Sequence, residues 1–220
     1  IAVSKDGAIY DYVSNREIYR LRGMTSYKFA GKEYVKVIPR PNFFRAPTDN
    51  DRANFMPYRY ADWKAASLCQ AIRDPYGEGT PVISSFNSGE DFAEVEYTYY
   101  LPTSIRSKVT VKYTVKPDGS IKVKMNYPHV EGLVDMPEFG MLFELPLDLE
   151  NVEWFGLGKE ETYADKTGGA KLSWYSNKVA DNMAKYLRPQ ECGNKMDVYE
   201  ASVTDNRGRG IKFYGNGMCF

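Results

Sequence analysis

The sequence predicts an all-β fold in which antiparallel strands form a sandwich. Apolar and polar residues alternate along several short segments, and turn residues such as Pro, Gly, Asn and Asp separate these segments. Aromatic residues make up 15% of the chain, with 18 Tyr and 11 Phe, which is a balance typical of a soluble β protein. Many short strands at regular spacing favour a sandwich, and 220 residues suffice for a sizeable core.

The clearest strand pair lies between residues 107 and 127. Valine or tyrosine occupies every second position from Val109 to Val115, and lysine or threonine fills the positions between them. A turn follows at Lys116–Gly119, where proline sets φ and glycine can adopt a positive φ. The alternation resumes at Ile121. This pattern predicts a β-hairpin with one buried face and one solvated face.

Further strands are expected wherever the same alternation or a run of β-forming residues occurs. These segments are Ala8–Val13, Glu17–Leu21, Tyr34–Ile38, Ala93–Leu101, Phe139–Leu145, Lys171–Trp174, Val198–Thr204 and Ile211–Tyr214. Helical patterns are scarce: Arg59–Ser67 predicts a short helix, and Val179, Met183 and Tyr186 stand at helical spacing.

The chain shows no linker, low-complexity tract or internal repeat, so we expect one β-sandwich domain over residues 1–220. It does not begin with Met, and its last residues, Gly217–Phe220, resemble the middle of a strand. A strand that stops there would leave an incomplete pairing edge. We therefore expect a fragment of a larger multidomain protein, truncated at its C-terminal end.

Composition excludes several classes of function. Lys and Arg together number 29, as do Asp and Glu, so there is no basic surface for nucleic acid. No apolar run approaches the roughly 18–20 residues that cross a membrane. Cys69, Cys192 and Cys219 form neither a disulfide framework nor a metal-binding pair. No signal peptide opens the chain, and because the parent's N-terminus is missing, cytoplasmic and periplasmic locations both stay open.

A first polar motif, N-F-F-R-A-P-T-D-N-D-R-A-N, spans Asn42–Asn54. A metal loop, paired catalytic carboxylates, a sugar site and a hydrogen-bonded corner are all compatible with Arg45, Asp49, Asn50 and Asp51. The spacing excludes a calcium loop, because no glycine follows at the required offset. If the chain is extended here, both aspartates share one face.

The same motif carries two packing expectations. Phe43 and Phe44 precede the polar residues and are expected to enter the core. Arg45 is expected to pair with a carboxylate, either in its own motif or in the segment 160–165.

A second motif, W-F-G-L-G-K-E-E-T-Y-A-D, spans Trp154–Asp165. It lacks the third glycine and the apolar context of a dinucleotide fingerprint. Glu161 and Asp165 could form an acid–base pair beside Tyr163, although carboxylates in a polar loop are more often solvated or salt-bridged.

A third motif, Y-L-R-P-Q-E-C-G-N-K, spans Tyr186–Lys195. It combines amide, carboxylate and cationic side chains with a proline, a glycine and an aromatic residue. Such groups suit sugar recognition and suit an interdomain contact equally well. The candidate residues are Arg188, Gln190, Glu191 and Asn194.

The chain has one histidine, His129, in a predicted loop. A Ser-His-Asp site would have to use it, but no G-x-S-x-G elbow is present, and a metal site with two histidines is excluded. A single histidine in a loop is most often a surface residue.

In their order and spacing, the three motifs resemble the C-terminal domain of the large β-galactosidases of glycoside hydrolase family 2, often called the small chain. The resemblance covers essentially the whole sequence. It implies an antiparallel supersandwich like that of galactose mutarotases. It also implies a parent enzyme that hydrolyses terminal β-D-galactosides with retention, using two glutamates about 5–5.5 Å apart.

In that family the glutamates lie on an upstream (β/α)₈ barrel, and no stretch of this chain shows the alternating strands and helices of such a barrel. The resemblance therefore implies no catalytic residue, no metal site and no cofactor in this chain. Any Mg²⁺ and Na⁺ would bind through the parent's barrel domain. The implied partners are the barrel and sandwich domains of the same polypeptide, a galactoside in the intact enzyme, and further copies in a homo-oligomer.

The resemblance makes the polar motif residues candidates for carbohydrate binding or domain contact. They are Arg45, Asp49, Asn50, Asp51, Glu161, Tyr163, Asp165, Arg188, Gln190, Glu191 and Asn194. Two positions depart from the family pattern, since Thr162 and Cys192 stand where Asn is common. Trp63, Trp154 and Trp174 do not match the aromatic residue that stacks on the sugar in the family, because that residue lies in a later loop.

Two other functions remain open from the sequence. A free-standing carbohydrate-binding module is one alternative. An aldose epimerase is the other, and it is less favoured because His129 alone supplies too few acid–base groups.

Overall fold

The computed structural model describes residues 23–24, 26–71, 81–188 and 190–220. The chain divides into two compact units, one formed by Ile1–Ala46 with Asn54–Glu144 and the other by Pro47–Ala53 with Leu145–Phe220. Antiparallel strands dominate the described part and helices are few, which confirms the all-β prediction. The expectation of a single domain stays a prediction. The strands expected at Ala8–Val13 and Glu17–Leu21 lie outside the described residues.

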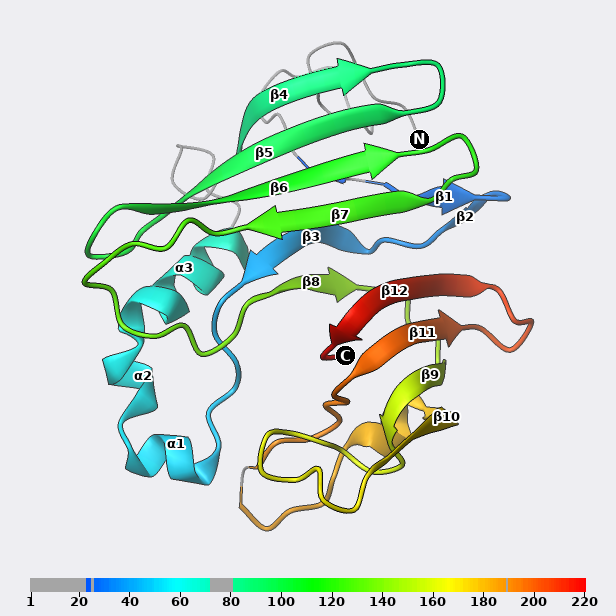
Figure 1. The fold of residues 1–220 in the computed structure, drawn as a ribbon. Coiled ribbons are helices and arrows are strands. Elements are labelled where there is room, and N and C mark those ends of the chain that lie inside the picture. The colour runs from blue at the N-terminus through cyan, green and yellow to red at the C-terminus, as the bar shows by residue number, and fades with distance from the viewer. Residues whose placement is uncertain (1–22, 25, 72–80, 189) are drawn as a thin grey trace. The chain divides into compact units, whose positions relative to one another are not determined.

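The first unit is built on a four-stranded antiparallel sheet with the order β4-β5-β6-β7 (Figure 1). Its strands are β4 (Val82–Ser88), β5 (Ala93–Leu101), β6 (Ser107–Val115) and β7 (Ile121–Asn126). The predicted hairpin is therefore confirmed, and Gly119 adopts a φ of 84° in its turn. Strand β4 was not predicted, because only some of its alternate positions are apolar.

One face of this sheet forms a core. Val111 stands directly opposite Tyr97 and Met125 on the neighbouring strands. Helix α3 contributes Trp63, whose ring lies 5.9 Å from that of Phe43, between centroids. Phe43 is fully buried and Phe44 packs against the same cluster, as expected for both.

The remaining elements of this unit are short. They are β1 (Lys28–Phe29), β2 (Lys32–Glu33), β3 (Val37–Asn42), α2 (Met56–Arg59), α3 (Ala61–Ala71) and β8 (Gly140–Glu144). Strands β3 and β8 pair antiparallel, and α3 packs on β3. Helix α3 confirms the predicted helix, and β8 confirms the strand predicted around residue 142.

The strand predicted at Tyr34–Ile38 is displaced, because β3 begins only at Val37. The carboxylate of Glu33 explains the difference. Its Oε1 accepts the N–H of Val35 at 3.1 Å, and it shares the N–H of Tyr34 with the Tyr27 carbonyl, which is 3.0 Å away. A local side chain thus takes the backbone donors that a neighbouring strand would otherwise use.

The second unit contains a four-stranded antiparallel sheet with the order β10-β9-β11-β12, coloured yellow to red in Figure 1. Its strands are β9 (Asn151–Gly158), β10 (Lys171–Lys178), β11 (Val198–Thr204) and β12 (Gly210–Met218). The strand predicted at Val198–Thr204 is confirmed with the same limits. Strand β9 was missed, because its two glycines and its continuation into a polar segment suggested a loop.

Two short helical segments belong to this unit, α1 (Asp49–Ala53) and the 3₁₀ turn η1 (Val179–Asn182). The spacing of Val179, Met183 and Tyr186 indicated a helix, but the helical segment ends at Asn182. The side-chain amide of Asn182 donates to the carbonyl of Lys178 at 3.2 Å and exchanges hydrogen bonds with Asn177. These side-chain bonds compete with further helical turns, and the chain is extended at Met183.

Candidate functional site

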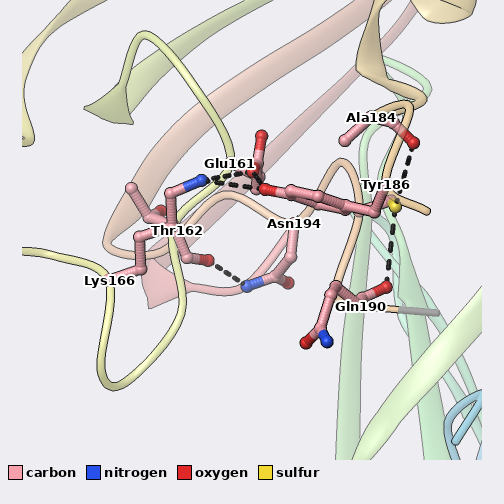
Figure 2. A network of polar contacts seen from close by, with 8 residues as sticks. Glu161, Thr162, Lys166, Ala184, Tyr186, Gln190 and Asn194 are labelled. Atoms are coloured by element: carbon pink, nitrogen blue, oxygen red, sulfur yellow. Dashed lines mark hydrogen bonds and ion pairs between the residues drawn. The ribbon is translucent and has the colours of Figure 1, made fainter. Parts of the chain in front are cut away.

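Two polar loops of the second unit form the candidate site. The first follows β9 and contains the second half of the second sequence motif, and the other precedes β11 and contains the third motif (Figure 2). Thr162 links them: its N–H donates to the carbonyl of Asn194 at 2.8 Å, and the Asn194 side-chain amide donates back to the Thr162 carbonyl at 2.6 Å. The hydroxyl of Thr162 also accepts the N–H of Met196 at 2.8 Å.

Thr162 stands where Asn is common in the family, and it still connects the two loops. It is 2% exposed, and all of these bonds use its backbone or its single hydroxyl. A side-chain amide is therefore not needed to connect the two loops here. Cys192, the second departure, directs Sγ toward the carbonyl oxygens of Gln190 at 3.5 Å and Ala184 at 3.8 Å.

Glu161 is a buried charge of the site, with only 8% of its surface exposed. Lys166 donates from Nζ and Tyr186 donates from Oη to the same oxygen, Oε1 of Glu161 (Figure 2). Lys166 Nζ also donates to Tyr186 Oη at 3.1 Å, which closes a triangle of polar contacts. The three residues join the two loops a second time.

The contacts set the charge of each group in this triangle. Burial by itself would raise the pKa of Glu161, but the hydrogen bonds from Lys166 and Tyr186 outweigh it and lower the pKa to about 2. The bond to Glu161 raises the pKa of Lys166 and that of Tyr186. Glu161 is therefore an anion and Lys166 a cation throughout the neutral range.

Lys195 belongs to the second of these loops, at the end of the third motif. It is 4% exposed, and its Nζ sits 5.1 Å from the centroid of the Trp154 ring. Burial lowers the pKa of Lys195, while the nearby charges of Glu161 and Glu160 act in the opposite direction. The negative charge of Glu161 thus interacts with the positive charges of both Lys166 and Lys195.

The first motif contributes a different arrangement. Thr48 and Asp51 cap α1 reciprocally, because Thr48 N–H and Oγ1–H both donate to Asp51 Oδ2 at 2.9 Å and Asp51 N–H donates to Thr48 Oγ1 at 3.2 Å. The backbone here is helical, so the idea that Asp49 and Asp51 share one face of an extended chain is wrong. The T-x-x-D spacing in the sequence could have predicted this cap.

Asp49 meets the third motif. Arg188 donates from Nη1 to Asp49 Oδ2 at 3.1 Å, across 139 positions of sequence. The Arg188 side chain is 77% exposed, so this ion pair contributes little stability. It leaves most of the guanidinium accessible to a ligand or to another protein surface.

The structure therefore brings together only some of the predicted site residues. Glu161 and Asn194 belong to the joined loops, Tyr163 lies with its ring centroid 6.0 Å from Lys166 Nζ, and Asp49 pairs with Arg188. Of the other predicted residues, Asn50 and Asp165 are exposed, and Gln190 and Glu191 are half-buried.

Arg45 belongs to the first unit, where its Nη1 donates to the Ala46 carbonyl at 3.3 Å. Its pairing with a carboxylate stays a prediction. Lys166 and Tyr186 were not singled out as site residues, because a single lysine or tyrosine in a polar loop carries no distinguishing sequence signal, whereas Lys195 was noted only as one polar group of the third motif.

Other features of the described residues are less suited to chemistry. A pocket of about 340 Å³ in the first unit is lined by Trp63, Tyr127 and Phe139 with His129 at its edge. His129 is exposed, as expected for a lone loop histidine. Among the residues that the structure places, no group of His, Cys, Asp and Glu could hold a metal ion. Within that same part of the chain, no helix is long and apolar enough to cross a membrane.

Comparison of the sequence with known proteins shows which family it matches. The family model described as β-galactosidase small chain matches residues 17–219. A β-galactosidase from Halalkalibacterium halodurans is 38% identical over 192 residues, which cover 86% of this chain and 18% of that protein. A β-galactosidase from Streptococcus thermophilus is 35% identical over 197 residues, which cover 90% of this chain and 18% of that protein.

A shorter relative is also similar. The β-galactosidase small subunit from Latilactobacillus sakei is 34% identical over 204 residues, which cover 86% of this chain and 64% of that subunit. The chain spans less than a fifth of the length of the two longer relatives. Because the small-chain model covers nearly all of the sequence, this chain belongs to the β-galactosidase small chain family.

Proposed function

We propose that this chain is a non-catalytic part of a β-galactosidase that hydrolyses terminal β-D-galactosides with retention. In this proposal it supports a catalytic barrel formed elsewhere in the enzyme and helps to shape the substrate site. Any Mg²⁺ or Na⁺ requirement belongs to that barrel. Membership of the small chain family supports the proposal, together with the relatives named β-galactosidase that contain such a segment.

The state of Glu161 is the observation that carries the non-catalytic role. A retaining glycosidase needs two carboxyl groups about 5–5.5 Å apart, and one of them must hold a proton near neutral pH. Glu161 does not fit the acid role, since its contacts with Lys166 and Tyr186 lower its pKa to about 2. It does not suit the ionised nucleophile either, because it is buried and its Oε1 already accepts from both side chains. Its carboxylate is committed to joining two loops and cannot act as a general acid at neutral pH.

The accessible groups beside these loops suit a supporting contact with substrate or with a neighbouring domain. Arg188 is highly exposed next to Asp49, and Asn50 is exposed on α1. A sugar hydroxyl could accept from the guanidinium and donate to the carboxylate.

The proposal is tested by assaying the 220-residue chain with a chromogenic β-galactoside. We expect no turnover above the buffer rate, with the full-length H. halodurans β-galactosidase as positive control. Turnover that the Glu161→Gln substitution abolishes would place a catalytic carboxylate in this chain and overturn the proposal. In a parallel titration with galactose and lactose, a saturable change in tryptophan fluorescence would favour a free-standing carbohydrate-binding module instead.

A further inference from the structure

Strand β12 carries a β-bulge near its end. Its register with β11 pairs Tyr214 with Glu200. The next pair along the ladder is Met218 with Val198, so three residues of β12 stand opposite a single residue of β11. A bulge leaves the extra residues without a partner in the ladder. The backbone of these three residues is therefore less constrained than the paired part of β12. They are Gly215, Asn216 and Gly217.

The residues of the bulge form a chemically reactive pair. Asn216 is the only asparagine of the sequence that is followed by a glycine. Because glycine has no Cβ, nothing shields its backbone nitrogen from the side-chain carbonyl carbon of the asparagine before it. Gly217 adopts a φ of 68°, which residues with a Cβ rarely do. Asn216 is exposed, so water reaches its side-chain amide.

A second exposed asparagine of the same hairpin provides an internal comparison. Asn206 donates from Nδ2 to Glu150 Oε1 at 3.1 Å, and its Oδ1 accepts from Asn151 Nδ2 at 3.3 Å. These bonds fix the Asn206 side chain away from its own backbone, and the next residue is an arginine. Among the residues that the structure describes, no hydrogen bond or ion pair holds the side chain of Asn216.

We propose that Asn216 is a modification site at which the chain deamidates without an enzyme. The backbone nitrogen of Gly217 loses its proton to a solvent base and forms a bond to Cγ of Asn216. The bond from Cγ to the side-chain nitrogen breaks, ammonia leaves, and a five-membered succinimide remains. Water then adds to one of the two ring carbonyl carbons and opens the ring, which gives aspartate or isoaspartate. The net reaction consumes one water molecule, and nothing is oxidised or reduced.

Both products disturb the end of β12. Each places a negative charge at residue 216. Asp197 Oδ1 is 3.6 Å from the point where a Cβ on Gly217 would stand, so a carboxylate already borders the bulge and would repel a second one. Isoaspartate also lengthens the main chain by one carbon. The pairing of Val198 with Met218 follows directly and would have to shift.

The bulge is connected to the candidate site through the residues that follow it. Phe220 N–H donates to the Lys195 carbonyl and Lys195 N–H donates to the Phe220 carbonyl, each at 2.9 Å. Lys195 is the last residue of the third motif. A displaced β12 end would weaken these two bonds, so deamidation of Asn216 should loosen one of the two joined loops.

Peptide mass spectrometry tests the reaction directly. The complete polypeptide that carries this segment is incubated, folded, at mildly alkaline pH and then digested with trypsin, which cuts after Arg207 and Lys212 and so separates Asn206 from Asn216. A sample digested before incubation corrects for conversion during digestion. We expect Asn216 to convert several times faster than Asn206, with isoaspartate in excess over aspartate.

Three results would overturn the proposal. The first is an Asn216 that keeps its amide in the folded polypeptide and converts only after unfolding in urea. The second is conversion of Asn206 and Asn216 at equal rates, which would indicate general unfolding. The third is formation of aspartate without isoaspartate, which would exclude the succinimide.

A substitution provides an independent readout. Asn216→Gln keeps the amide, but its cyclisation would need a less favourable six-membered ring. The melting temperature of the wild type should fall during incubation, whereas that of Asn216→Gln should stay constant. The matched control is Asn206→Gln, which should change with time as the wild type does. An equal fall for Asn216→Gln and the wild type would contradict the proposal. Turnover of a β-galactoside is not used as a readout, so failure of the proposed function is distinguishable from failure of this inference.

Discussion

At the scale of single residues, Glu161 determines how the two candidate loops are held together. A buried carboxylate would be costly without partners, and here Lys166 and Tyr186 donate to it from their side chains. Lys195 lies buried on the Trp154 ring nearby and feels the same negative charge. The role of Glu161 is therefore electrostatic and structural.

This role predicts a pH-dependent effect of the Glu161→Gln substitution. The pKa of Glu161 is lowered from its ordinary value of 4.5 to about 2, so the carboxylate stabilises the folded state above pH 4.5 and loses this contribution as the pH falls toward 2. We expect the variant to be less stable than the wild type by about 2 kcal/mol at pH 7. The difference should shrink progressively below pH 4.5. Urea unfolding at several pH values measures it.

The matched control for this prediction is Glu160→Gln. Glu160 is the preceding residue and is exposed, so its substitution should change stability by less than about 0.5 kcal/mol. A stability difference for Glu161→Gln that does not vary with pH would contradict the ionic role assigned to its carboxylate.

At the scale of elements, Gly156 of β9 allows close packing against the start of β11. A Cβ on Gly156 would lie 2.8 Å from Val198 Cγ2, 3.0 Å from Val198 Cα and 3.1 Å from the Asp197 carbonyl oxygen. Two of these three atoms belong to the backbone, which cannot rotate away as a side chain can. The glycine that suggested a loop in the sequence is therefore required by the contact between two strands.

We accordingly expect Gly156→Ala to destabilise the second unit by about 2 kcal/mol, because the strands would have to separate. Thermal unfolding followed by circular dichroism measures the effect. Gly168→Ala is the control, since a Cβ at Gly168 would meet nothing within 4 Å. If both substitutions left the melting temperature unchanged, the close approach of β9 to Val198 would be refuted.

At the scale of the whole molecule, exposed apolar side chains are combined with balanced charge. Trp174 on β10 and Tyr214 on β12 are exposed, and the formal net charge at pH 7 is zero, with an isoelectric point near 6.8. Without net charge, electrostatic repulsion does not oppose association through apolar patches.

Self-association of the 220-residue chain should therefore be strongest near pH 6.8 and weaker at a higher pH, where the chain becomes negative. Light scattering as a function of pH measures it. The double substitution Lys122→Glu and Lys124→Glu, at two exposed positions of β7, should move the maximum to a lower pH. Association that stays constant across pH would argue against this electrostatic control.

The sequence alone determined several of the strands, the buried face of the hairpin and the family, although it missed β4 and β9. Alternation at Val109–Val115 predicted a buried and a solvated face because side chains of a strand point alternately to its two sides. Phe43 was placed in the core for a similar reason, since a large apolar side chain next to a polar motif seeks burial. Whether a strand face or a side chain is buried depends on residues that are neighbours along the chain, so the sequence alone can predict it.

Only the tertiary structure decided which polar groups meet. The pairing of Asp49 with Arg188 spans 139 positions, and neither residue indicates the other in the sequence. The carboxylate of Glu33 accepts the N–H of Val35, and the predicted strand begins later than expected. The carboxylate of Asp51 accepts the N–H of Thr48 and caps α1. Local periodicity encodes which face is buried, whereas the partner of a charged side chain depends on where the folded backbone places distant loops.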